Sequence, residues 1–240
     1  RRQRQMCIRD RVNTLPTAEA AEGLYYTLDE QYNLANGDTV TVTVHSNRDD
    51  FSDCIEKYGA IPAATEKTYT VEGLNEYVTD SDGLTDSVLV SLQNQAEDVL
   101  NAYIAKSWDS ECVTLKGMSY LGYYILTPKN KDNYGVYQDV IILPYQVTSH
   151  NHFEDDKGQV YDADVSYYWY IAFRNVSKDA DGNIAGGLDD YYTANASFDV
   201  ETGLDDGWWE KYWSYDGYQT LDELYSNAVT RNVEDYNHQD

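Results

Sequence analysis

The residues best suited to chemistry are three potential metal ligands spaced two apart, His150, His152 and Glu154. In an extended strand, positions i, i+2 and i+4 point to one face, so these side chains are expected to lie side by side. Imidazole and carboxylate are common metal ligands, but the sequence offers no obvious fourth ligand and the stretch precedes a loop. A solvated polar strand end is therefore the preferred interpretation, with a metal site as the alternative.

A second candidate is the acidic loop at 177–183, which resembles part of a calcium-binding loop. When Gly182 takes the invariant glycine position, Asp179 and Asp181 fall on ligand positions, but Leu188 stands where a bidentate Glu is required. A β-turn between two strands is therefore preferred. A looser calcium site is the alternative, using Asp189, Asp190, Asp205 or Asp206.

An aromatic cluster near the C-terminus raises the possibility of sugar binding. Its members are Trp208, Trp209, Tyr212, Trp213, Tyr215 and Tyr218. Exposed rings would stack on sugars, whereas buried rings would close a small core. Core packing is the preferred interpretation, because large aromatic side chains usually lie in the interior. The run Tyr167–Tyr170 poses the same question, because strand alternation places its rings on two opposite faces.

Catalysis has little support in the sequence. The chain has four His, and no G-x-S-x-G elbow, HExxH motif or P-loop is present. In a chain this acidic, pairs of carboxylates carry no information, so a cleft enzyme with an acidic site is kept only as an alternative. We therefore expect a non-enzymatic protein with no cofactor.

Charge and composition exclude several partners. The 240 residues include 42 Asp and Glu against 17 Lys and Arg, a formal net charge of −25. Such a chain repels the phosphates of nucleic acids and anionic membranes. No apolar run reaches the length of a membrane span. The 24 Tyr residues make the chain too aromatic for a disordered protein.

The first eleven residues differ from the rest. Residues 1–11 read RRQRQMCIRDR and hold five of the basic residues, without the apolar core of a secretion signal. The string resembles a translated sequencing adaptor, so we leave it out of fold reasoning and expect the true N-terminus, with any signal or anchor, to be missing. The remaining body then carries a charge of −29 and two cysteines, Cys54 and Cys112. They are expected to lie in separate modules without a disulfide.

Residues 12–80 are predicted to form a small β module. Asn36-Gly37 predicts a turn, and the alternating Val and Thr of residues 39–44 predict a strand with two different faces. A further strand is expected at 67–71, which favours a sandwich-like module. A polar linker is predicted at 81–86.

Residues 87–240 are predicted to form an α+β domain. Leu89–Ile104 carries apolar residues at helical spacing. Strands are expected at 112–128, with a bulge at Gly117, and at 135–150, 160–176 and 191–200. A final helix at 220–236 begins with a capping box of Thr220 and Glu223. The expected class is mainly β or α+β, with a helix on an antiparallel sheet of the cystatin-like or NTF2-like kind. The segment 208–236 is expected to cover the opposite face of that sheet.

Two groups of residues carry a family resemblance: Leu34–Val42 followed by Tyr69–Leu74, and Tyr120–Thr127 followed by Asp139–Ile141. They resemble the extracellular region of uncharacterised Gram-positive surface proteins, which combine a zinc ribbon, a membrane span and β-rich modules. Teicoplanin-resistance-associated membrane proteins have a similar layout. The resemblance implies an extracellular, envelope-anchored module and brings no catalytic residues.

The sequence thus predicts a non-enzymatic bacterial surface protein that acts as a binding or structural module. A cell-wall or extracellular glycan, or a protein, is the expected partner, and nucleic acid is not. The alternatives are a carbohydrate-binding module that uses the aromatic cluster, and the cleft enzyme described above.

Overall fold

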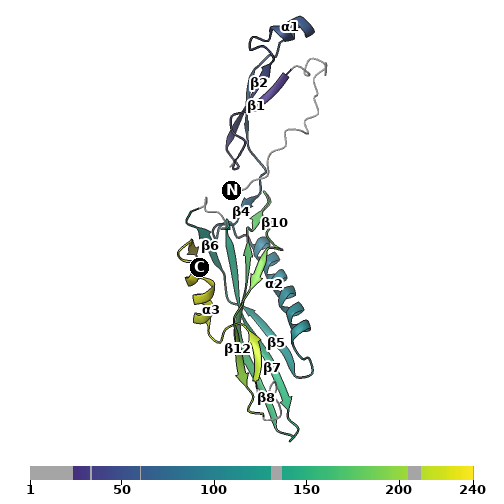
Figure 1. The fold of residues 1–240 in the computed structure, drawn as a ribbon, viewed down its shortest axis with the longest axis vertical. Helices are drawn as coiled ribbons and strands as arrows, with labels where there is room; N and C mark the ends of the chain where they lie inside the picture. The colour runs from purple at the N-terminus through teal and green to yellow at the C-terminus, as the bar shows by residue number, and fades with distance from the viewer. Residues whose placement is uncertain (1–23, 33, 60, 131–136, 205–211, 240) are drawn as a thin grey trace. The chain divides into compact units, whose positions relative to one another are not determined.

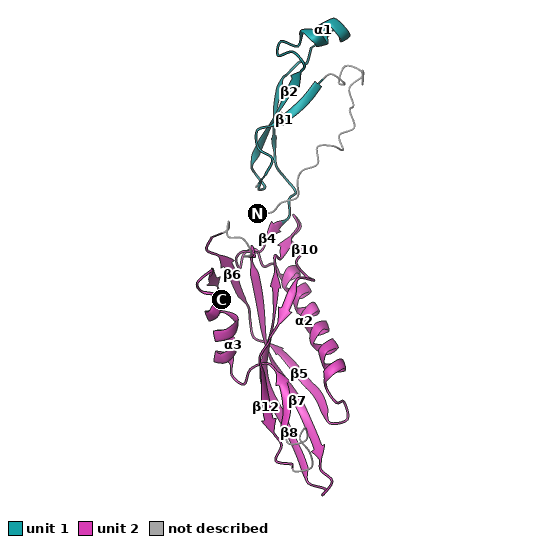
Figure 2. Cartoon of the chain, viewed as in Figure 1, with its two compact units in different colours: residues 1–75 teal, residues 76–240 magenta. Residues whose placement is uncertain are grey.

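The computed structural model describes most of the chain, and that part divides into two compact units. The described residues are 24–32, 34–59, 61–130, 137–204 and 212–239. The first unit comprises residues 1–75 and the second residues 76–240 (Figure 2). The architecture is mainly β with few helices, which confirms the expected class.

The first unit contains a three-stranded antiparallel sheet in the order β1-β2-β3. The strands are β1 (Leu24–Leu28), β2 (Thr39–Ser46) and β3 (Glu66–Thr70), and helix α1 (Ser52–Tyr58) lies between β2 and β3 in the chain. Its buried cluster is small: Leu34, Val40 and Val71, with Leu28 and Leu74 packed against them. The described residues of this unit therefore form one sheet, and not the two packed sheets of a sandwich.

The predicted turn before β2 is present, and hydrogen bonds to Leu74, which is distant in the sequence, hold it in place. Gly37 has a φ of 89°, a conformation that glycine adopts without strain. The Asn36 side chain accepts a hydrogen bond from the Leu74 backbone N–H and donates one to the Leu74 carbonyl, both at 2.9 Å. One amide thus joins the segment before β2 to the segment after β3, where these two strands meet at the same end of the sheet.

The second unit begins at Glu76, inside the segment 12–80 that the sequence assigns to the first module. Strand β4 (Glu76–Tyr77), expected in the first module, pairs with β9 (Ser177–Lys178), which in turn pairs with β10 (Ile184–Gly186). The boundary between the units therefore falls at Asn75 and Glu76, and residues 81–86 are not a linker. Instead, the chain turns there into the long helix.

Helix α2 (Asp86–Ser107) confirms the predicted amphipathic helix. Thr85 is its N-cap, and the Thr85 hydroxyl accepts a hydrogen bond from the Val88 N–H. The buried stripe consists of Val88, Leu92, Ala96 and Leu100, with Leu89, Val99, Tyr103 and Ile104 half-buried beside it. Trp108 caps the other end and belongs to the same core.

A six-stranded antiparallel sheet forms the centre of the second unit, in the order β11-β8-β7-β6-β14, with β5 also paired to β7. Its strands are β5 (Val113–Tyr120), β6 (Tyr124–Pro128), β7 (Val140–Glu154), β8 (Val160–Arg174), β11 (Tyr191–Thr193) and β14 (Tyr236–Gln239). The predicted strand at 112–128 is thus two strands, and the one at 191–200 is divided between β11 and a further strand, β12 (Ser197–Glu201). The expected bulge is present between Leu115 and Gly117.

The two strands β5 and β6 share one edge of β7, and Pro144 lies where they meet. Tyr120 of β5 pairs with Tyr145, and Tyr124 of β6 pairs with Ile142. Pro144 falls between these two pairings and has no N–H to contribute to a ladder. A proline is therefore tolerated within the longest hairpin of the sheet.

A long helix covers one face of the sheet and a short helix covers the other. Helix α2 lies on one face and α3 (Leu221–Ala228) on the other (Figure 1). The predicted capping box is present: the Thr220 hydroxyl accepts from the Glu223 N–H, and the Glu223 carboxylate accepts from the Thr220 N–H. The helix is shorter than predicted, because the chain continues through a 3₁₀ turn (Thr230–Asn232) and strand β14, which pairs with β6.

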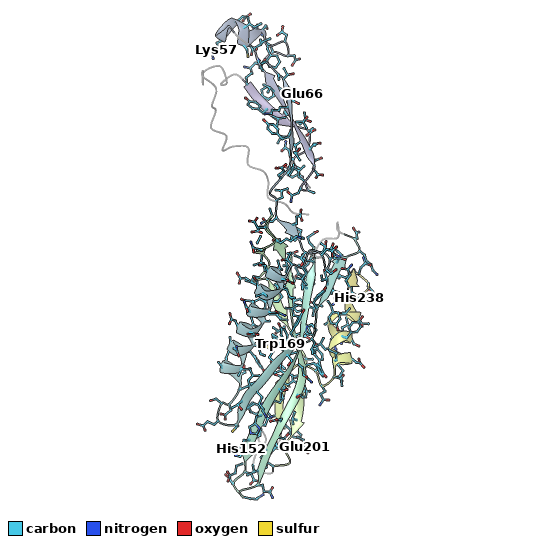
Figure 3. The ribbon with its side chains drawn as sticks, turned by 180° about the vertical axis from the view of Figure 1, so that it is seen from behind. Lys57, Glu66, His152, Trp169, Glu201 and His238 are labelled. Atoms are coloured by element: carbon cyan, nitrogen blue, oxygen red, sulfur yellow. The ribbon has the colours of Figure 1, made fainter. Side chains whose placement is uncertain are left out.

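A two-stranded hairpin of β12 (Ser197–Glu201) and β13 (Tyr212–Asp216) covers the rest of the α2 side. The Tyr215 ring contacts Trp108 at the end of α2, with centroids 5.7 Å apart. Trp169 lies near the middle of the sheet, whereas His152 and Glu201 lie toward its far end (Figure 3). The hairpin therefore shares a face with α2, and α3 is the described part of 208–236 that covers the opposite face.

Candidate functional site

The far end of the β7–β8 hairpin presents one packed face and one open face. Along residues 146–154 of β7, burial alternates strictly: the odd-numbered side chains are buried, and the even-numbered ones are half-buried or exposed. The same alternation continues across the ladder into residues 160–166 of β8. Because neither α3 nor the β12–β13 hairpin covers the even-numbered side, a polar sheet face is left open to solvent.

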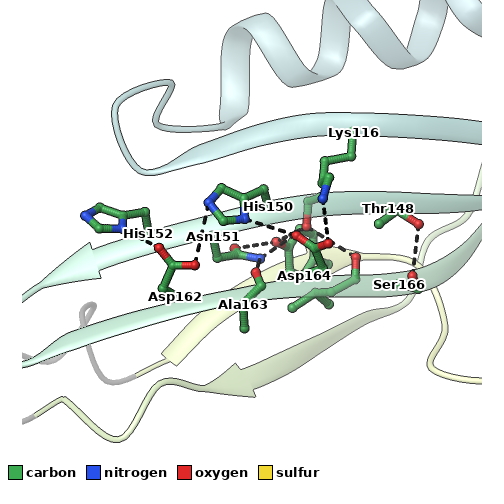
Figure 4. A network of polar contacts seen from close by, with 12 residues as sticks. Lys116, Thr148, His150, Asn151, His152, Asp162, Ala163, Asp164 and Ser166 are labelled. Atoms are coloured by element: carbon green, nitrogen blue, oxygen red, sulfur yellow. Dashed lines mark hydrogen bonds and ion pairs between the residues drawn. The ribbon is translucent and has the colours of Figure 1, made fainter.

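Paired histidines and aspartates form rungs across this open face (Figure 4). His150 Nδ1 lies 3.0 Å from Asp164 Oδ1, and His152 Nδ1 lies 2.9 Å from Asp162 Oδ2. Lys116, which reaches over from β5, donates to Asp164 Oδ2 at 2.7 Å. The hydrogen bonds from Lys116 and then His150 hold the pKa of the Asp164 carboxyl below its usual value.

A hydroxyl rung continues the pattern toward the middle of the sheet. Thr148 and Ser166 are cross-strand partners, and their hydroxyl oxygens lie 2.9 Å apart. We name the surface formed by these side chains the polar face. Its members are Lys116, Thr148, His150, His152, Glu154, Asp162, Asp164 and Ser166.

The three candidate metal ligands share one face, as their spacing requires. His150 and His152 each use Nδ1 to bond an aspartate, and Glu154 stands opposite Val160 at the end of the ladder. Across the described residues, no cluster of three or more His, Cys, Asp or Glu side chains is arranged to hold a metal ion. The preferred interpretation, a solvated polar surface, fits the geometry, although β7 runs through these residues and does not end at His150.

The acidic loop that resembled a calcium site is a hairpin turn. Asp179 Oδ1 accepts hydrogen bonds from the backbone N–H groups of Asp181, at 3.0 Å, and Asn183, at 2.9 Å. The Gly182 carbonyl accepts from the hydroxyl of Thr85, at 2.6 Å. These bonds commit the Asp179 carboxylate to the turn and tie the turn to the start of α2. Asp205 and Asp206 lie outside the described residues.

Of the four described members of the aromatic cluster, two belong to the core. Tyr215 and Tyr218 are buried, Trp213 is half-buried against Phe153, and Tyr212 is exposed. Tyr218 stacks on Tyr170 and pairs through its backbone with β8. Trp208 and Trp209, the first two members, lie outside the described residues.

A buried hydrogen-bonded triangle lies directly beneath the polar face. Tyr215 Oη donates to Asn151 Oδ1 at 2.6 Å, and Asn151 Nδ2 donates to Ser149 Oγ at 3.3 Å. Ser149 Oγ lies 2.6 Å from Tyr215 Oη, so its hydrogen completes the triangle. Burial raises the pKa of Tyr215. The triangle fixes β13 against β7, and it thereby fixes the strand that carries His150 and His152.

Two further features bear on the enzyme alternative. A hollow of about 560 Å³ is lined by residues 184–190, and its side chains with ionisable groups are the carboxylates of Asp189 and Asp190. Asp190 is paired with Arg174, whose nitrogen lies 2.5 Å away. The carboxyl whose pKa is raised, Asp139, is fully buried and does not line this hollow.

Lys116, Asp162 and Asp164 were not predicted from the sequence to belong to the site with the histidines. A signal for them existed, because a turn at 155–158 between two strands places His150 opposite Asp164 and His152 opposite Asp162. Lys116 had no such signal, since the bulge in β5 decides which way its side chain points. Asp139 was also missed, because an acidic residue beside an apolar run gives no indication of burial.

Comparison of the chain with family models, with curated proteins and with solved structures finds no match in any of the three. The class that the fold defines is therefore the description that stands: a mainly β chain of two units, the second a sheet between two helices. In the described ranges, no helix combines the length and the apolarity that a membrane crossing needs. Cys54 and Cys112 are both free thiols, one in each unit.

Proposed function

We propose that this chain is a non-enzymatic binding module of an extracellular, envelope-anchored bacterial surface protein, and that it binds a neutral cell-wall glycan on the polar face. The observation that carries the proposal is the contrast between the two sides of one hairpin. The odd-numbered side chains are buried along β7 and half-buried along β8, and the even-numbered side is an open row of hydrogen-bonding groups. Such a surface suits an extended ligand that lies along a sheet.

The chemistry of the face favours a hydroxyl-rich partner over a protein. Protein interfaces depend on buried Trp, Tyr and Arg anchors, and none of the members of the polar face is Trp, Tyr or Arg. Carboxylates, imidazoles and hydroxyls instead offer donors and acceptors at the spacing of neighbouring strands, about 5 Å. The net charge of −25 opposes anionic wall polymers, so the ligand is expected to be uncharged.

The location rests on the strand-rich acidic composition and on the family resemblance. An anchored protein also compensates for weak single contacts, because many copies on one surface bind one polymer together. The non-enzymatic character is supported by the absence of catalytic motifs from the sequence, and by the full burial of Asp139, which no substrate reaches.

The glycan part of the proposal is tested by retention on purified cell-wall polysaccharide. The variant D162A/D164A removes the acceptors of both histidine rungs and is expected to weaken retention at least tenfold, about 1.4 kcal/mol. The matched control, E97A/D98A, makes the same charge change on the exposed side of α2 and should be retained like the wild type. No retention of the wild type, or equal weakening in both variants, would overturn the assignment.

The location is tested separately in cells that carry the complete gene. Protease added outside intact cells should digest the two units of an envelope-anchored protein while a cytoplasmic marker stays intact. Protection of the protein until the cells are lysed would contradict an extracellular position, whatever the result of the glycan assay.

A further inference from the structure

A buried carboxyl group, Asp139, lies at the start of β7 without a full set of partners. Its side chain is 0 % exposed. Oδ1 accepts one hydrogen bond, from the Val176 backbone N–H at 2.9 Å, and Oδ2 is buried without a hydrogen-bond partner. A buried carboxylate anion needs several donors to replace water, and one backbone N–H does not suffice.

Among the residues that the structure describes, no cation compensates Asp139. Arg174 lies opposite Val140 in the β7–β8 ladder, but its guanidinium donates to Asp190 Oδ1 at 2.5 Å and to the Tyr137 hydroxyl at 2.7 Å. Burial raises the pKa of Asp139 to about 8, and the Val176 N–H lowers it only in part. The other charged groups on the strands that pack at this turn are Lys178 of β9 and Glu76 of β4. None of these charges adds to the two causes of the shift.

The hydrogen bond from Val176 links Asp139 to the strand that opens the second unit. Val176 donates to Asp139, and its carbonyl accepts from the Val78 N–H at 2.9 Å. Val78 directly follows β4, which has two residues and is held by its pairing with β9. Asn175, at a φ of 52°, turns the chain here and donates its N–H to the Asp139 carbonyl. The Val176 turn is therefore the point through which β4 is held in place.

We propose that Asp139 is a pH-sensitive latch: its protonated carboxyl keeps the Val176 turn and β4 closed, and loss of that proton as the pH rises releases them. In the released state water reaches the carboxylate and replaces the missing donors. Release frees residues 76–78, which adds about 10 Å of extended chain to the connection between the two units. The latch goes beyond the proposed function and does not depend on the ligand of the polar face.

The sign and size of the effect follow from proton linkage. In the open state Asp139 ionises near the ordinary value of about 4, and in the closed state near 8. Between these values the closed state binds more protons, so each pH unit upward favours opening tenfold. The latch is thus tight in acid, loosens between pH 4 and 8, and changes little above pH 8.

Amide hydrogen exchange of the full chain tests the latch. The protection factor of the Val78 N–H, corrected for the intrinsic rate at each pH, should fall up to about 100-fold between pH 5 and pH 7. In D139N, which cannot ionise, the factor should be the same at both values. A wild-type factor that does not change with pH, or a D139N variant that keeps the wild-type dependence, would overturn the proposal.

A second variant separates the latch from simple loosening of the same strands. D179A removes the oxygen that accepts from the Asp181 and Asn183 N–H groups in the β9–β10 turn, so it should lower the protection of Val78 equally at pH 5 and pH 7. If D139N does not fold, the pH dependence of the wild-type protection factors still tests the latch. Between pH 5 and pH 7 the Val78 N–H must lose more protection than the amides at the centre of β7, and an equal loss would overturn the proposal.

Discussion

The two ends of the β7–β8 hairpin differ in how their side chains are buried. At the end near α3, Val140–Tyr145 and Trp169–Phe173 are buried without interruption, because helices cover both faces. At the far end, burial alternates, because one face packs on β13 and the other is open. The first end reads in the sequence as a continuous apolar run and the second as alternation, as expected for strands covered on two faces or on one.

The comparison teaches where stability and recognition reside in this unit. The doubly covered end contains several fully buried large side chains, among them Phe173, Ile142 and Ile171. The open end contains ion pairs between side chains that are 38–55 % exposed, which contribute little to folding. Residues at the open end are therefore free to serve binding, and the predictions below test that division.

The largest effect is expected at the doubly covered end. F173A removes a fully buried ring and leaves a cavity, so the free energy of unfolding should fall by about 3–5 kcal/mol. Chemical denaturation measures this directly. A loss below about 1 kcal/mol would show that this end is not the stability core, and the contrast between the two ends would fail.

A large effect that depends on pH is expected for D139N. Because the native state holds the Asp139 proton up to about pH 8, wild-type stability falls as the pH rises from about 4 to about 8. The free energy of unfolding of D139N relative to wild type should therefore rise by up to about 2.7 kcal/mol between pH 5 and pH 7. Urea unfolding at the two pH values measures it, and a relative stability that is the same at both would refute the buried-acid description.

Some parts of the fold could be predicted from the sequence alone and others could not. The class, the long helix, the capping box at Thr220 and the bulge at Gly117 were predicted, since each has a local pattern of spacing or residue type. The placement of β4 in the second unit was not, because a two-residue strand leaves no periodicity and its partner lies about a hundred residues away.

The candidate site was predicted in part, for a similar reason. The histidines and their shared face follow from spacing, and the burial of Tyr215 and Tyr218 follows from the tendency of aromatic rings to pack inside. The position of β13 on the same face as α2 follows neither from residue spacing nor from the burial of aromatic rings. It depends on where the chain crosses the edge of β8 at Tyr218. Packing between distant segments decides such choices.

An intermediate effect is expected at the boundary between the two ends, from Y215F. The change keeps the ring but removes the hydroxyl that bonds Asn151 and Ser149, so two buried polar groups lose a partner. The free energy of unfolding should fall by about 1–3 kcal/mol. Y212F, at an exposed position in the same strand, is the control and should unfold like the wild type within about 0.5 kcal/mol. Equal effects in the two variants would mean that the triangle does not hold β13.

The smallest effect on folding is expected on the polar face itself, where D162A/D164A should leave the melting temperature unchanged. The side chains of Asp162 and Asp164 are about half exposed, so water replaces their bonds to His150, His152 and Lys116 when they are removed. The same variant is expected to lose retention on cell-wall polysaccharide, so folding and binding should separate in one protein. Thermal unfolding at pH 7 provides the check. A drop in melting temperature comparable to that of Y215F would make the histidine rungs part of the fold, and the open end could then no longer be described as a surface kept for a ligand.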